Sequence, residues 1–139
     1  MSIQPQNSAK ISHYLGVDFG LAKVGLAIAD SETKIAFAYK TLENNPELFN
    51  KLKEIIAQEE IGKIIIGKLN SKIRQEAFDI ENIGKDFADK LGVEVEYQEE
   101  MFSTKMAETL LKEKGAKKIK ESDNQEAARI ILQSWLDKK

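Results

Sequence analysis

Three acidic positions carry the side chains best suited to chemistry in this sequence. Asp18 ends a short apolar run, the pair Glu99 and Glu100 follows an alternating segment, and Asp123 stands at the start of the last helical pattern. Adjacent carboxylates repel each other, so such a pair favours a nearby cation or a raised pKa. The chain has no cysteine and one histidine, so thiol, Ser-His and His-rich zinc chemistry are poorly supported.

Asp18 lies at the end of an expected strand, at the rim of a sheet, where α/β proteins commonly place ligand sites. Strand alternation puts Leu15 and Val17 on one face and Tyr14, Gly16 and Asp18 on the other. An aspartate that accepts hydrogen bonds from its own turn would explain the same residue without any function.

The glutamate pair leaves one choice open. In a straight strand Glu99 shares a face with Val93, Val95 and Tyr97, and Glu100 points to the opposite face. A strand end can twist or bulge, so periodicity does not decide which of the two faces a site. Together with the nearby acids of the segment, both could equally form an ordinary solvated charge run.

Asp123 has two interpretations as well. Helical spacing places it on one face with a set of small and apolar residues that we expect to pack on the sheet, namely Ala127, Ile130, Ile131 and Ser134. That packing would direct the carboxylate inward, toward the rim. The alternative is a capping role, because both Ser122 with Gln125 and Asp123 with Glu126 match a capping box.

A lysine-rich segment leads into Asp123. Five lysines fall within nine residues, at 112, 114, 117, 118 and 120. A cationic segment beside carboxylates suits a phosphate-backbone ligand, although solvated loop lysines would look the same. With a formal net charge of -2, any basic surface must be local.

The elements that would position these side chains follow from periodicity and turn residues. We expect strands at 13–18, 23–30, 33–39, 63–67 and 93–97, and helices at 46–60, 75–91, 103–114 and 122–136. Short links between the first three strands indicate an antiparallel meander, and the later alternation with helices indicates parallel strands. The prediction is an α/β fold with a mixed five-stranded sheet, ordered 3-2-1-4-5 in chain numbering, and helices on both faces.

The length of 139 residues fits one domain, expected at 13–139 after a polar tail at 1–12. The tail has no apolar segment typical of a secretory signal. No apolar run approaches the roughly 18 residues of a membrane span, so we expect a cytoplasmic protein with no membrane partner.

Four segments, taken together, resemble the YqgF/RuvX family over nearly the whole chain. The family pattern Asp-x-Gly-x-Lys-Arg-Ile/Val-Gly-Val-Ala corresponds to DFGLAKVGLA at 18–27, and Gly-Leu-Pro corresponds to GKL at 67–69. The family pattern Asp-Glu-Arg-Leu/Phe-Ser/Thr-Thr/Ser-x-x-Ala corresponds to EEMFSTKMA at 99–107, and Asp-x-x-x-Ala-Ala-x-x-Ile-Leu corresponds to DNQEAARIIL at 123–132. The family is described as RNase H-like, related to Holliday-junction resolvases and associated with processing of ribosomal RNA precursors.

The resemblance implies a metal-dependent nuclease. It selects Glu100 over Glu99, giving a catalytic and metal-binding set of Asp18, Glu100 and Asp123. Oxygen ligands of this kind suit Mg²⁺ or Mn²⁺, which can assist water attack on a phosphodiester. The residues expected to contact nucleic acid are Lys23, Ser103, Thr104, Lys117 and Lys118, and structured RNA is favoured over a DNA junction as partner.

Three departures from the family pattern remove a cation or a rigid turn near this set. Ala22 and Met101 stand where the family has a lysine and an arginine, and Lys68-Leu69 stands where it has Leu-Pro. A catalytically silent domain that binds nucleic acid or protein is therefore one alternative, and a DNA nuclease like the Holliday-junction resolvases is another. Asp-Phe-Gly followed by a hairpin also resembles the phosphate loop of actin-like ATPases, but those proteins need two such domains.

Overall fold

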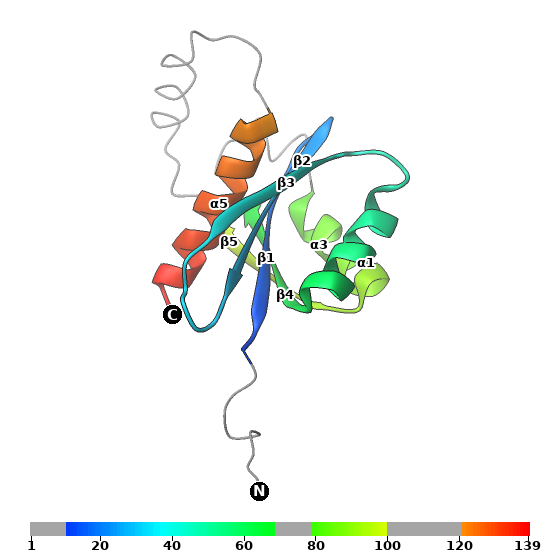
Figure 1. Ribbon diagram of the computed structural model, residues 1–139. Coiled ribbons are helices and arrows are strands. Elements are labelled where there is room, and N and C mark those ends of the chain that lie inside the picture. The colour runs from blue at the N-terminus through cyan, green and yellow to red at the C-terminus, as the bar shows by residue number, and fades with distance from the viewer. Residues whose placement is uncertain (1–10, 69–78, 100–120) are drawn as a thin grey trace, which may run out of the picture.

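A five-stranded sheet separates two layers of helix in the computed structural model, which describes residues 11–68, 79–99 and 121–139 (Figure 1). The strands are β1 (His13–Phe19), β2 (Lys23–Asp30), β3 (Phe37–Glu43), β4 (Ile61–Lys68) and β5 (Glu94–Glu99). The helices of the described residues are α1 (Leu48–Glu59), α3 (Ile80–Leu91) and α5 (Glu121–Asp137).

The sheet has the order β3-β2-β1-β4-β5, which confirms the predicted 3-2-1-4-5 arrangement. The first three strands pair antiparallel, whereas β1 with β4 and β4 with β5 pair parallel. The three-residue link between β1 and β2 allows only a hairpin, and helices connect the parallel strands as crossovers require. The predicted mixed sheet and its central first strand are therefore confirmed.

Two apolar cores lie on opposite faces of the sheet. Leu15 and Val17 of β1 pack toward α1 and α3, around the fully buried Phe87. Ile65 of β4 belongs to the other core, under α5, together with Trp135. Because both neighbours of Ile65 in β4 point to the first core, this strand is buried on both faces, as its continuous apolar sequence predicts.

The predicted third strand, 33–39, is wrong by four residues, because β3 begins at Phe37. The Asp30 carboxylate accepts hydrogen bonds from the backbone N–H groups of Glu32 and Thr33, and these bonds close a turn. The backbone beyond it is held by a distant side chain, since Gln133 of α5 accepts from the Ala36 N–H at 2.9 Å. Within residues 31–36, backbone groups therefore form hydrogen bonds to Gln133 of α5 and do not pair with β2.

The helix predicted at 75–91 begins later than expected within the described residues. Asp79 is its N-cap, and its carboxylate accepts a hydrogen bond from the Asn82 N–H, so helical backbone starts at Ile80. The predicted stop at Gly92 is confirmed, because this residue has a φ of 68° and its N–H bonds the Ala88 carbonyl. Residues 75–78 lie outside the described part of the chain.

The predicted sheet-facing stripe of α5 is wrong in three of its four members. Ile131 is buried, but the helix buries with it Ala128, Leu132, Trp135 and Leu136, and only half-buries Ala127, Ile130 and Ser134. The large Trp135 decides the orientation, because its ring packs edge-on against Tyr14 at 4.9 Å between centroids. The helix is consequently turned about its own axis, so that the buried positions come about one residue later in the sequence than predicted.

Other expectations fall partly beyond the described residues. The helix predicted at 103–114, the lysine-rich segment and residues 1–10 of the predicted tail all lie outside them. At the near end of that tail, Ser12 and Ser31 exchange two hydrogen bonds, one between backbones and one to the Ser31 hydroxyl. None of the described helices is long and apolar enough to cross a membrane.

Candidate active site

The carboxyl ends of β1, β4 and β5 lie at one edge of the sheet, because these three strands are parallel. Helix α5 begins at the same edge, at the top of Figure 1, and runs down one face toward its end near the carboxyl terminus. Open α/β sheets bind ligands at this kind of edge, so the candidate site is built from what these strand ends and the first turn of α5 present.

Asp18 occupies this edge on the face that α5 covers. Gly16, two residues earlier on the same side of β1, would carry a Cβ within 2.7 Å of Leu132 in α5. Strand alternation therefore turns the half-buried Asp18 side chain toward α5, on the face that the sequence predicts it to share with Gly16. Its direct partner in β2 is Gly25, and the parallel register of β1 with β4 brings Gly67 beside it on the other side.

The first turn of α5 rests on Gly25. A Cβ at this position would lie 2.0 Å from the backbone oxygen of Asn124 and 2.4 Å from its carbonyl carbon. Only a glycine permits so close an approach, so the missing side chain of Gly25 sets the position of the helix start. Gly25 is the strand partner of Asp18, and Asp123 immediately precedes Asn124 in the helix. The contact at Gly25 therefore holds the backbone of Asp123 close to the end of β1.

The contacts of β5 show which face of the sheet Glu99 occupies. Tyr97 faces α3, where its hydroxyl donates to the Glu81 carbonyl oxygen at 3.2 Å, whereas Glu96 faces α5 and accepts from the Trp135 indole N–H at 2.9 Å. By alternation Gln98 lies on the Asp18 face and Glu99 on the α3 face, where Glu99 is exposed. Glu99 is thus directed away from Asp18, while Glu100 lies outside the described residues.

Gln98 is a polar residue of this edge that the sequence analysis missed. It is 2% exposed and pairs in register with Gly67, on the face of Asp18. Its side-chain amide donates to the Glu99 carbonyl oxygen at 3.0 Å. The strict alternation of β5 was the available signal, because it makes Gln98 the only uncharged polar member of that face of the strand.

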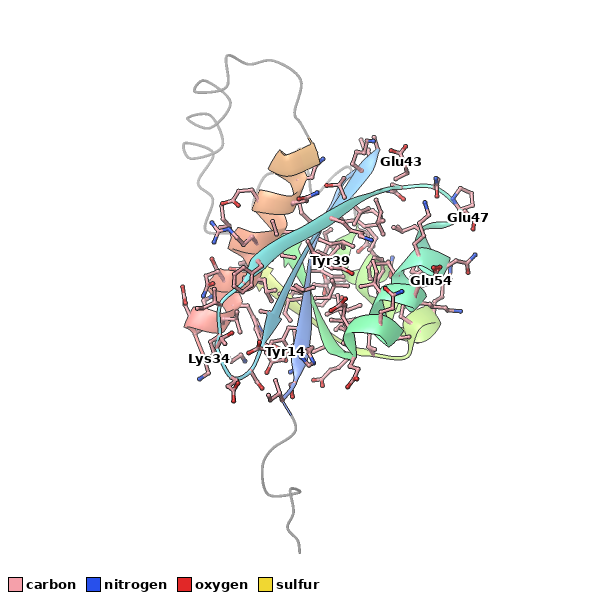
Figure 2. All side chains as sticks on the ribbon, viewed as in Figure 1. Tyr14, Lys34, Tyr39, Glu43, Glu47 and Glu54 are labelled. Atoms are coloured by element: carbon pink, nitrogen blue, oxygen red, sulfur yellow. The ribbon has the colours of Figure 1, made fainter. Side chains whose placement is uncertain are left out.

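Lys23, expected to contact nucleic acid, lies on the Asp18 face at the start of β2. Its ammonium donates a hydrogen bond to the carboxylate of Glu43, its register partner at the end of β3. That hydrogen bond, followed by the lysine charge, lowers the pKa of Glu43. Figure 2 shows Glu43 at the same end of the sheet as the start of α5. The pairing of Lys23 with Glu43 could not be predicted from periodicity, because it depends on the register between β2 and β3.

The remaining predicted site residues are described incompletely. The backbone of Asp123 lies in α5, but its side chain is outside the described set, as are Glu100, Ser103, Thr104, Lys117 and Lys118. Within the described residues, no group of three histidine or acidic side chains is arranged to hold a metal ion. Asp18 and Lys23 are therefore the two predicted side chains whose positions at the edge are established.

The fold is the RNase H-like α/β fold of RuvC. The Thermus thermophilus RuvC structure in complex with a Holliday junction substrate superposes with a TM-score of 0.59. The match covers 91% of this chain and 94% of that one at 16% sequence identity. A second RuvC structure from the same organism gives a TM-score of 0.52 at 14% identity, over 89% and 93% of the two chains. At such identities the likeness concerns the fold alone.

The family follows from the sequence relatives. The model of the RuvX family, described as Holliday junction resolvase, matches residues 12–138, and the chain belongs to this family. A relative from Maridesulfovibrio salexigens, named "Putative pre-16S rRNA nuclease", is 34% identical over 88% of this chain and 96% of its own length. A relative of the same name from Orientia tsutsugamushi is also 34% identical, over 88% and 82% of the two chains. The resemblance noted from the motifs is confirmed.

Proposed function

We propose that this protein is a divalent-metal-dependent nuclease that hydrolyses phosphodiester bonds in ribosomal RNA precursors. The observation that carries the proposal is the close approach of the first turn of α5 to Gly25, the strand partner of Asp18, at the carboxyl ends of the parallel strands. Membership of the RuvX family and the shared name of the relatives support the class of reaction and the class of substrate. The same substrate class implies work in the cytoplasm.

The donor chemistry of the edge fits Mg²⁺ or Mn²⁺. Asp18 offers carboxylate oxygens, and the helix start brings the backbone of Asp123 beside Gly25. The one histidine, His13, begins β1 and so lies at the other end of that strand. Oxygen donors without nitrogen or sulfur are the ligand set that these hard cations prefer. When bound, such a cation activates water and neutralises charge that develops on the phosphodiester.

We assign Asp18, Glu100 and Asp123 as the metal-holding carboxylates. The exposed position of Glu99 on the α3 face argues against it, and extending the alternation of Glu96 and Gln98 by one step assigns Glu100 to the face of Asp18. In this assignment Asp18 is the central ligand, because it alone of the three belongs to the middle strand of the sheet.

Lys23 takes the role of a phosphate contact in this proposal. It lies two residues from Gly25 on the Asp18 face, and its ammonium can exchange the Glu43 carboxylate for a phosphate oxygen. Ser103, Thr104, Lys117 and Lys118 are proposed as further contacts to the nucleic-acid backbone. Structured RNA is the preferred substrate in this proposal, with a four-way DNA junction as the second candidate.

The test is cleavage by the wild type and by Asp18→Asn. Labelled precursor-like structured RNA, a four-way DNA junction and unstructured single strands are each incubated with Mg²⁺ or Mn²⁺. We expect metal-dependent cleavage of structured RNA, and a loss of about 10²-fold or more with Asp18→Asn, as for other single-donor losses at electrostatic sites. The variant should also lose the rise in melting temperature that Mg²⁺ or Mn²⁺ gives the wild type.

The matched control is Asp89→Asn, which makes the same charge change on the exposed surface of α3. It should keep wild-type cleavage and the wild-type metal response. Cleavage of junctions but not RNA would redirect the substrate to DNA. Binding of RNA without any metal-dependent cleavage, and without a thermal response to either ion, would refute the enzyme and identify a silent binding domain.

A further inference from the structure

The tip of the β1–β2 hairpin carries an apolar side chain beside the candidate site. Leu21 is 75% exposed, more than any other large apolar residue among those the structure describes. It follows Asp18 by three residues, so it stands at the edge where the parallel strands end. A single exposed leucine is common on protein surfaces and carries no meaning by itself.

The backbone on both sides of Leu21 is held in place. The Asn44 side-chain amide donates to the Gly20 carbonyl oxygen at 2.7 Å, and the Asn44 backbone N–H donates to the Ala22 carbonyl oxygen at 2.9 Å. Gly20 itself is in a tight turn, where a Cβ would lie 2.6 Å from the Lys23 oxygen. The hairpin thus presents Leu21 from a braced tip, anchored to the end of β3, and its exposure is built into the fold.

The surroundings of Leu21 indicate what it would meet. Lys23, two residues on, offers a cation for a phosphate, and Asp18 lies on the other side of the turn. Leu21 therefore stands in the chain between the proposed metal ligand and the proposed phosphate contact, so a nucleic-acid backbone held by both groups would pass the hairpin tip. Apolar side chains contact nucleic acid by packing on base faces or by inserting at base steps that are already open or easily unstacked.

We propose that Leu21 is a specificity-determining wedge that packs against unpaired or unstacked bases next to the scissile phosphate. The proposal rests on the nuclease function proposed above, and it narrows the substrate to sites where bases near the cleavage position are open. Because the tip is braced before the substrate arrives, little ordering entropy opposes the contact. A continuous duplex would gain nothing from Leu21, since its base faces are covered.

The test compares Leu21→Ala with the wild type on two RNA substrates of equal sequence, one with unpaired bases at the cleavage position and one fully paired by a complementary strand. A tenfold change corresponds to about 1.4 kcal/mol, which burial of a leucine side chain against a base can supply. We expect kcat/KM to fall about tenfold on the open substrate and less than twofold on the paired one. The control is Ile35→Ala, at an apolar residue of the β2–β3 link that is 51% exposed, and this substitution should change neither value.

A binding assay keeps this proposal separate from the nuclease function. In the Asp18→Asn background, 2-aminopurine placed in the open segment should change its fluorescence on binding, and the added Leu21→Ala should abolish most of that change. Equal losses on both substrates, or an unchanged fluorescence response, would overturn the wedge. If the wild type cleaves nothing, the nuclease proposal fails, and the fluorescence experiment still decides whether Leu21 contacts bases.

Discussion

Replacing Gly25 by alanine tests whether the start of α5 belongs to the site. The new Cβ would lie 2.0 Å from the Asn124 backbone oxygen, about 1.4 Å short of an ordinary 3.4 Å contact. The obstacle is helix backbone and cannot rotate away, and α5 is also in close contact with the sheet at Gly16. The first turn must therefore pivot outward by about the missing distance, carrying Asp123 away from Asp18.

The expected effect on cleavage is larger than the effect on stability. Overpacking of this kind costs about 1–3 kcal/mol, or about 3–9 °C in melting temperature for a domain of this size. That leaves the protein almost fully folded at 25 °C, given typical stabilities of about 5–15 kcal/mol. A displacement near 1 Å in a catalytic constellation can cost about 10²-fold, so we expect Gly25→Ala to lose about that much cleavage.

Two glycine variants serve as controls for this experiment. Gly62→Ala in β4 meets no heavy atom within 4 Å and should leave both cleavage and melting temperature unchanged. Gly16→Ala presses on Leu132, farther along α5, and should lower stability with a smaller loss of cleavage. If Gly25→Ala melts at a lower temperature and yet cleaves like the wild type, the helix start is not part of the site and the reasoning is refuted.

Three further substitutions test other parts of the structure. The hydrogen bond from Lys63, followed by that from Trp135, lowers the pKa of Glu96, so its stabilisation is present above about pH 4.5 and is lost as the pH falls through the lowered pKa. Glu96→Gln should therefore lower the melting temperature at pH 7, and its difference from the wild type should shrink as the pH falls below about 4.5; a difference independent of pH would contradict this. Gln133→Ala should cost about 1–3 kcal/mol by leaving the buried Ala36 N–H unpaired, with cleavage unchanged; an unchanged melting temperature would argue against that role. Glu43→Gln should increase RNA affinity at low salt, and the increase should disappear in a Lys23→Ala background; a gain that persists there would show that the glutamate acts by general repulsion alone.

Local patterns were sufficient to predict the sheet and the position of Asp18. Short links between the early strands, and the doubly buried β4, determine the strand order, and alternation in β1 assigns Asp18 to one face. Alternation in β5 places Glu99 and Glu100 on opposite faces, although it did not decide which of the two faces the site. These properties depend on residues within one or two elements, which is why a single sequence carries them.

Properties that depend on distant contacts were predicted poorly. The start of β3 is set by Gln133, which is 97 residues from Ala36 in the sequence. The rotation of α5 is set by the packing of Trp135 on Tyr14 and by the close approach at Gly25. In each case residues far apart in the chain decide the placement of a strand or helix, and no periodicity within either segment contains that information.

The pairing of Lys23 with Glu43 changes how a chain of net charge -2 can bind a polyanion. A lysine that must give up a carboxylate to take a phosphate exchanges one ion pair for another, so it contributes little net affinity and releases fewer counterions than a free cation. The affinity at this edge must then come from other contacts, and two of those proposed above are the carboxylates with a bound cation and the braced Leu21. Lys23 should accordingly contribute little to the salt dependence of RNA binding. The affinity should depend strongly on whether the bases beside the cleavage position are open.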